Sequence, residues 1–288
     1  MTKRSGLEQE AAQKKATLAK NASEARATKL MIAAQRGDAQ KVVELAKKDP
    51  QAASEDRDDL GQTALMHAAD GMDMQCLMAL LPLGGAAAVD GNGDGALERA
   101  VRAGWIPGAI ALAQVLDRDG ELSSKRGIMP LAAEKCSKND VHGTLLKILL
   151  RSCGAEGLGA GESTPLMFAA RENAENWVEA LAPVSDPWAL SKSGWIALTW
   201  AVAGMLTRGH INVRILNTIL DRMESALEPQ DGREGQAWAV SQKMAQHLRS
   251  QDLDSRLERM RAIIEGHAIE RATGAPCKQK ASSFAHSL

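Results

Sequence analysis

The stretch from Asp58 to Gly71, DDLGQTALMHAADG, decides the fold. Asp58 and Gly61 are residue types that tight turns favour, and Thr63 stands where its hydroxyl can cap a helix that begins at Ala64. The leucine and the two alanines that follow form a narrow face of small apolar residues. The pattern therefore predicts a turn that leads at once into a short helix, packed closely against a neighbour.

The same pattern returns along the chain at a nearly constant interval. Its closest copy is TPLMFAA, which begins at Thr164. The position of Thr63 recurs in steps of 35, 32, 34, 35 and 32 residues, at Thr28, Thr63, Gly95, Met129, Thr164 and Ile196. A period of about 33 residues with this signature is typical of stacked repeats, in which each unit buries its apolar face against its neighbours.

At these residues the chain resembles the ankyrin repeat family, over roughly residues 28 to 222. The resemblance implies that each repeat is a β-turn followed by two antiparallel helices. We therefore expect an all-α ankyrin-repeat solenoid of about six repeats with C-terminal capping helices. The family is mainly one of protein-interaction modules. The expected function is thus a non-catalytic scaffold, an adaptor or regulator that recognises a protein partner through the concave face of the stack.

The sequence divides into four segments. Residues 1–27 are polar and rich in alanine, which predicts a leader helix or arm, and the repeat domain spans 28–230. Residues 231–272 read as helices that cap the apolar face of the last repeat, because a solenoid needs such a cap. The same helices could instead recruit a partner. Residues 273–288 carry few apolar side chains and predict a flexible tail.

Composition limits the classes of function. Hydrophobic residues make up 44% of the chain but aromatic residues only 3%, which fits thin, closely packed helices better than an aromatic-lined enzyme pocket. The net charge of −1 gives no general argument for a nucleic-acid or membrane partner. The four cysteines lack the paired spacing of zinc sites and disulfide frameworks. No apolar run reaches the roughly 18 residues of a membrane span, so we expect a cytoplasmic protein. We also expect a monomer without cofactors.

Patterns of catalytic sites are missing from the sequence. The six histidines show no His-Glu-x-x-His spacing, and no Gly-x-Ser-x-Gly segment occurs. The glycine-rich segment before Thr164 lacks the lysine that a phosphate-binding P-loop places directly before its hydroxyl residue. The sequence therefore predicts that the protein is not an enzyme.

Two alternatives remain open from the sequence. Asp90–Gly95, DGNGDG, has carboxylate and amide residues at positions 1, 3 and 5 and glycine at position 6, as in an EF-hand calcium loop. Position 12 is Val101 instead of the bidentate glutamate, and the segment also fits as another turn between repeats, which is the favoured interpretation. The second alternative is a microbial effector or immunity-type protein that sequesters one specific protein.

The family's contact positions, carried onto this chain, predict a partner-binding surface on the turn tips and the first helices. The tip residues are Asp59, Leu60, Gln62, Asp94, Lys125, Arg126, Lys192 and Trp195. The first-helix residues are Arg102, Phe168, Arg171 and Trp200.

Trp195 and Trp200 stand out among these residues, because tryptophan is enriched in binding hot spots. Each ring could instead pack between repeats or shield a turn. The predicted surface is acidic in its first half and basic in its second half. A partner with an acidic segment and an aromatic or aliphatic anchor near Trp195 would complement the second half.

Overall fold

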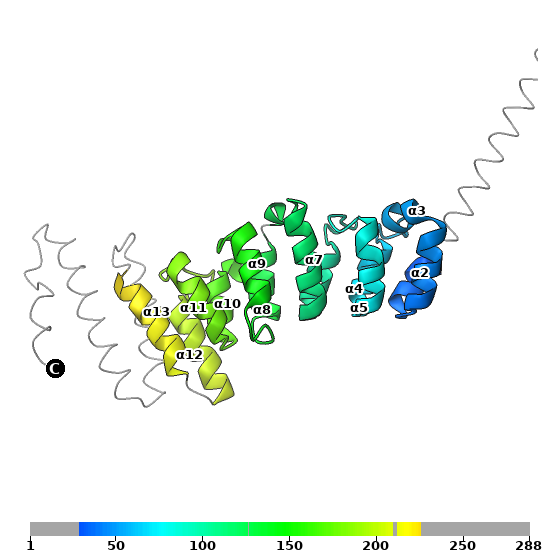
Figure 1. The fold of residues 1–288 in the computed structure, drawn as a ribbon. Coiled ribbons are helices and arrows are strands. Elements are labelled where there is room, and N and C mark those ends of the chain that lie inside the picture. Colours follow the sequence, from blue (N-terminus) through cyan, green and yellow to red (C-terminus); the bar gives the residue numbers. More distant parts are fainter. Residues whose placement is uncertain (1–28, 126, 210–211, 226–288) are drawn as a thin grey trace, which may run out of the picture. The chain divides into compact units, whose positions relative to one another are not determined.

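A computed structural model describes residues 29–125, 127–209 and 212–225 of the chain (Figure 1). The predicted leader at 1–27, the cap at 231–272, the tail at 273–288 and Arg126 lie outside these ranges. The chain divides into two compact units after Gly154, and each unit is described by itself. Within the described ranges, the regular structure is helical apart from one isolated β-bridge between Val89 and Gly95.

The first unit is built from successive pairs of antiparallel helices (Figure 1). The pairs are residues 29–35 with α2 (Ala39–Lys48), α4 (Ala64–Asp70) with α5 (Met74–Leu80), α6 (Ala96–Arg102) with α7 (Ile106–Arg118), and α8 (Ile128–Lys135) with α9 (Thr144–Cys153). Shorter helices follow three of the pairs, namely α3 (Pro50–Glu55), η1 (Leu81–Leu83) and η2 (Leu122–Ser124).

The second unit repeats this architecture with longer final helices. Its pairs are α10 (Pro165–Arg171) with α11 (Glu175–Leu181), and α12 (Ala197–Arg208) with α13 (Val213–Ser225). Short 3-10 helices precede the first pair and follow α11, at η3 (Ala160–Glu162) and η4 (Ala182–Val184).

The deciding stretch folds as the sequence predicts. Thr63 caps α4, since its hydroxyl accepts a hydrogen bond from the Met66 amide at 3.4 Å. Ala68 and Ala69 are fully buried, and α4 packs against α6 through this small-residue face. In the same way α6 packs against α8, and α10 against α12 in the second unit. The expected all-α repeat fold is thereby confirmed.

A left-handed residue closes the turn between the two helices of several pairs. It is Gly37 in the first pair and Gly104 in the third, but in the second pair Met72 takes this position with φ of 52°. Gly71, one residue earlier, serves a different purpose. A Cβ on Gly71 would lie 3.0 Å from the carbonyl oxygen of Gln35, so glycine there permits close approach of the preceding repeat.

Repeat four begins two residues before the position that the sequence pattern indicated. The sequence placed its register at Met129, whereas α8 begins at Ile128 with Gly127 as its N-cap. Ala132 and Ala133 are fully buried and take the places that the paired alanines hold in α4. Burial of these small side chains therefore sets the register, and the steps on either side of this repeat become 32 and 37 residues.

Candidate partner-binding site

Hydrogen bonds fix the shape of the turn tip before α4. One carboxylate oxygen of Asp58 accepts from the amides of Leu60 at 2.9 Å and Gln62 at 2.8 Å, and the other lies 3.0 Å from Nε2 of His67. Burial alone would raise the pKa of Asp58, but the hydrogen bonds from the Gln62 amide and His67 lower it overall. The tip thus presents Asp59 and Leu60 outward, and Leu60 is 66% exposed.

The next tip uses the same turn, and arginines bind its carboxylates. Oδ1 of Asp90 accepts hydrogen bonds from the amides of Asn92 at 2.8 Å and Asp94 at 3.0 Å. Oδ2 accepts a hydrogen bond from Nη2 of Arg99 at 2.6 Å. Both Nη atoms of Arg102 donate hydrogen bonds to the carboxylate of Asp94, at 2.8 and 2.9 Å. The side-chain hydrogen bond from Arg99 is the main cause that lowers the pKa of Asp90. The calcium alternative would need these same oxygens, which the arginines already hold.

Lys125 is also held by its own chain. Its ammonium lies 3.0 Å from a carboxylate oxygen of Glu98, and the two side chains are 12% and 14% exposed. The other oxygen of Glu98 accepts from the Gly95 amide at 3.0 Å. In the first unit, the predicted site residues Asp94, Arg102 and Lys125 are therefore paired internally instead of presenting free charges.

The second unit brings four of the predicted residues into one cluster, which we call the aromatic–arginine cluster: Phe168, Arg171, Trp195 and Trp200. The Phe168 and Trp200 ring centroids are 5.9 Å apart, and Trp195 meets Trp200 edge-on at 6.0 Å. The guanidinium carbon of Arg171 lies 5.4 Å from the Phe168 centroid and 5.3 Å from the Trp200 centroid. At this range each ring attracts the cation.

Two local features position the cluster on α10 and α12. Thr164 caps α10, as its hydroxyl accepts from the Met167 amide at 3.4 Å. Gly204 in α12 allows the two helices to approach, because a Cβ there would lie 2.2 Å from the carbonyl oxygen of Arg171. The close approach places Trp200 beside Arg171.

The tip before α12 holds Trp195 in place. The amide of Trp195 donates to the Ser191 hydroxyl at 3.2 Å, and the Ser191 amide donates back to the Trp195 carbonyl oxygen at 3.0 Å. On the same tip, the Lys192 amide donates to the Gly161 carbonyl oxygen at 2.8 Å. Trp195 is left half-buried and Lys192 exposed.

The predicted surface included Phe168 as a contact residue, but the structure buries its side chain. Phe168 is only 2% exposed, so it supports Arg171 and Trp200 and offers no surface for direct partner contact. Trp200 is half-buried, and its indole Nε1 is a buried donor without a hydrogen-bond partner in the described part of the chain.

Two charged neighbours of the cluster, Glu172 and Arg208, were not predicted from the sequence. Glu172 accepts from Nε of Arg171 at 3.0 Å and from Nη2 of Arg208 at 2.5 Å, and Arg208 also donates to the Arg171 carbonyl oxygen. Arg208 is the last residue of α12, a helix of 12 residues. Its partners could not be predicted from the repeat pattern, because α12 extends beyond the seven-residue length of α4 and α10.

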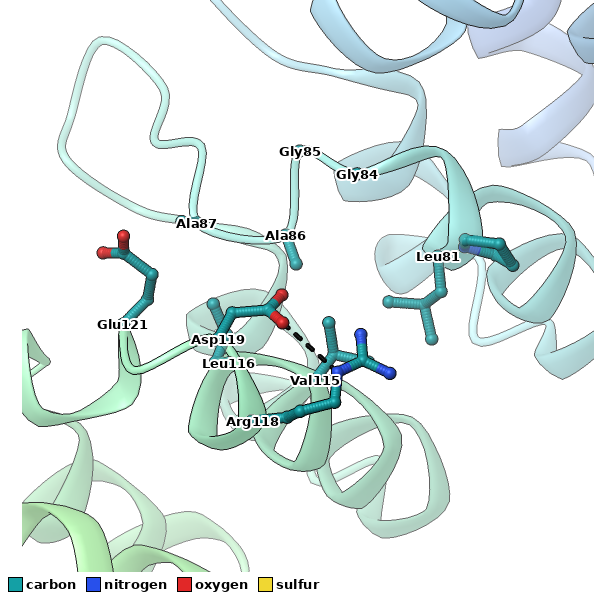
Figure 2. Close-up of a pocket in the computed structure, with 11 residues that line it drawn as sticks. Leu81, Gly84, Gly85, Ala86, Ala87, Val115, Leu116, Arg118, Asp119 and Glu121 are labelled. Carbon is teal, nitrogen blue, oxygen red and sulfur yellow. Dashed lines mark hydrogen bonds and ion pairs between the residues drawn. The ribbon is translucent and has the colours of Figure 1, made fainter.

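A separate hollow of about 380 Å³ lies in the first unit, where η1 and the C-terminal end of α7 meet (Figure 2). Gly84, Gly85 and Ala86 line one side with backbone and small side chains, and Arg118 and Asp119 line the other. Nε of Arg118 lies 3.2 Å from Oδ1 of Asp119. The predicted site residues do not line this hollow.

The described ranges, 29–125, 127–209 and 212–225, also lack membrane-spanning and metal-binding features. No helix in them is long and apolar enough to span a membrane. No three histidine, cysteine, aspartate or glutamate side chains gather there in a way that could hold a metal ion.

Comparison with known proteins agrees with this geometry. Residues 30–120 match the family model for ankyrin repeats (three copies). The resemblance to the ankyrin repeat family is confirmed, and the chain has the helical ankyrin-repeat fold. No curated protein matches the sequence.

Two solved structures show the same fold. The ankyrin repeat domain of human ASB11 is 17% identical, with a TM-score of 0.52, and the match covers 79% of this chain and 95% of that one. The second is a chain from the complex of the predatory endopeptidase Bd0816 of Bdellovibrio bacteriovorus with immunity protein Bd3460. It is 21% identical, with a TM-score of 0.51, over 67% of this chain and 96% of that one.

Proposed function

We propose that the protein is a non-catalytic scaffold, an adaptor or regulator that binds a protein partner. Ankyrin repeats generally mediate protein–protein interaction, which supports the class of function. The observation that carries the proposal for this chain is the aromatic–arginine cluster. It combines a half-buried tryptophan with an arginine on one surface, and both residue types are enriched in binding hot spots. We further expect a cytoplasmic monomer without a cofactor.

The proposed contact residues fall into two groups. Asp59, Leu60 and Gln62 on the first unit, and Arg171, Lys192, Trp195 and Trp200 on the second, have side chains at least partly exposed and are proposed to touch the partner. Asp94, Arg102, Lys125 and Phe168 are proposed to support these surfaces, because their side chains are engaged within the chain, although Arg102 itself is exposed. Arg126 stays a proposed contact outside the described ranges.

Affinity capture from the native lysate tests the proposal. Wild-type protein should capture one specific protein, and Trp195→Ala should lose it because the half-buried ring that faces the partner is removed. Trp188→Ala is the matched control. It removes the same kind of side chain from a half-buried position in the same unit, outside the cluster. Equal capture by wild type and Trp195→Ala would contradict the proposed site, whereas loss with both variants would point to damage of the fold.

A narrower candidate within this class is an immunity-type protein that sequesters one specific protein. The likeness to a chain from the complex of an endopeptidase with an immunity protein favours this candidate. If it is correct, the captured partner should have an activity of its own, and equimolar wild-type chain should inhibit that activity. Full activity of the captured partner in the bound state would exclude sequestration and leave the adaptor role.

A further inference from the structure

We propose that the aromatic–arginine cluster recognises an acidic segment of a partner protein, with one aspartate or glutamate carboxylate bound by Arg171. An apolar side chain beside that carboxylate packs on Trp195. This inference rests on the proposed function and specifies the chemistry of its partner.

The orientation of Arg171 is the first argument. Its guanidinium is held over the Phe168 and Trp200 rings, and only Nε is used, in the bond to Glu172. Within the described residues, Nη1 and Nη2 of Arg171 make no hydrogen bond. These two donors form the planar fork that matches a carboxylate in two parallel bonds. Stacking fixes the fork beforehand, so that little side-chain entropy is lost on binding.

The balance of charge is the second argument. Glu172 is shared between Arg171 and Arg208, so the three residues together carry one net positive charge. Lys192 adds another positive charge and makes no ion pair within the described part of the chain. Glu162, the exposed acidic residue of the adjoining tip, pairs with neither Arg171 nor Lys192 in those ranges.

The first unit provides the contrast that makes Arg171 distinctive. Arg99 binds Asp70 and Asp90, Arg102 binds Asp94, and Lys125 binds Glu98. Those cations already hold carboxylates from their own chain. A carboxylate from outside would have to displace an existing partner there, whereas the fork of Arg171 needs no such exchange.

The half-exposed ring of Trp195 supplies the apolar part of the site. Trp195 meets Trp200 in a T-shaped contact at 74°, and part of the Trp195 side chain remains exposed to solvent. A leucine or phenylalanine of the partner would cover this ring and exclude water from the neighbouring ion pair. Exclusion of water strengthens the attraction between carboxylate and guanidinium.

Selection from a phage-displayed library of random linear peptides on the full chain tests the inference. The selected peptides should carry aspartate or glutamate next to a large apolar residue. A synthetic peptide of this set should bind Arg171→Gln about ten- to a hundredfold more weakly than wild type, which is the usual effect of losing hydrogen bonds to a charged group. The same peptide with its acidic residue changed to the amide should lose a similar factor against the wild-type chain.

Arg214→Gln is the matched control. Arg214 lies on the same unit but pairs with Glu175 outside the cluster, so the variant should leave peptide binding unchanged. The amide peptide tests the inference on the wild-type fold even if Arg171→Gln unfolds. Peptides without an acidic preference, equal binding of the acidic and amide peptides, or failure to select any peptide would each overturn the inference. A protein captured from lysate and lost with Trp195→Ala would still support the proposed function in those cases.

Discussion

At the scale of single residues, the conformation of Met72 is the least expected feature of the first unit. A left-handed backbone costs a residue with a Cβ about 1–2 kcal/mol, and glycine avoids this cost. Met72 is 52% exposed, so little packing is lost when its side chain is removed. The close approach at Gly71 explains why the glycine of this copy stands one position early.

Met72→Gly should therefore increase the free energy of unfolding by about 1 kcal/mol, measured by denaturant titration. The control is Met78→Gly, at an equally exposed position in the interior of α5, which should lower the free energy of unfolding by about 1 kcal/mol. A destabilising Met72→Gly would show that the methionine side chain contributes more than its backbone strain costs.

Asp94 supplies the second prediction at this scale. The hydrogen bonds from Arg102 lower its pKa, so the unfolded state binds a proton more readily than the folded state. The stabilising contribution of Asp94 is complete above its unfolded pKa of about 4 and is lost as the pH falls through the lower folded pKa. Wild type should lose melting temperature on acidification, and Asp94→Asn should lose less between about pH 7 and pH 3.

Asp59→Asn provides the comparison for this experiment. Asp59 is exposed on the neighbouring tip and makes no ion pair among the described residues. Its variant should show the wild-type dependence of melting temperature on pH. If Asp94→Asn and Asp59→Asn behave alike, the pair of Asp94 with Arg102 contributes nothing to folding stability.

At the scale of elements, most of the repeat pattern could be predicted, because each copy carries its own turn, cap and small-residue face. Trp200 stands 32 residues after Phe168, which is one repeat, so the register alone places the two rings on adjacent first helices. The fourth copy misled the prediction because Met129-Pro130-Leu131 imitates the Thr-Pro-Leu start of the fifth. The bonds between Glu172 and Arg208 depend on the extra length of α12, which has no counterpart in the repeat pattern.

The contact between α10 and α12 yields an element-scale prediction. Gly204→Ala would force the two helices apart, because the added Cβ would meet the Arg171 carbonyl oxygen at 2.2 Å. Overpacking of this kind costs about 1–3 kcal/mol, and a lower melting temperature should report it. Gly127→Ala is the control, with φ of −79° and open space around its Cβ. The preference for glycine over alanine at an N-cap and the lower entropy of the unfolded alanine variant act in opposite directions, so stability should change by less than about 1 kcal/mol.

At the scale of the whole molecule, the two units use the same fold with different surface chemistry. In the first unit, charged side chains of neighbouring repeats form ion pairs with one another, such as Arg99 with Asp70 and Lys125 with Glu98. The second unit gathers aromatic rings around an arginine whose fork faces no partner within the described ranges. A stacked fold allows this difference, because each repeat depends mainly on its neighbours and its surface can vary independently.

The affinity of the captured partner for the full-length chain tests the central claim most directly. Titration calorimetry with wild type, Trp195→Ala and Trp188→Ala should give a dissociation constant at least about thirtyfold weaker for Trp195→Ala alone, since hot-spot truncations cost about 2 kcal/mol or more. Equal dissociation constants for all three proteins would contradict the account, because partner binding would then be independent of the aromatic–arginine cluster.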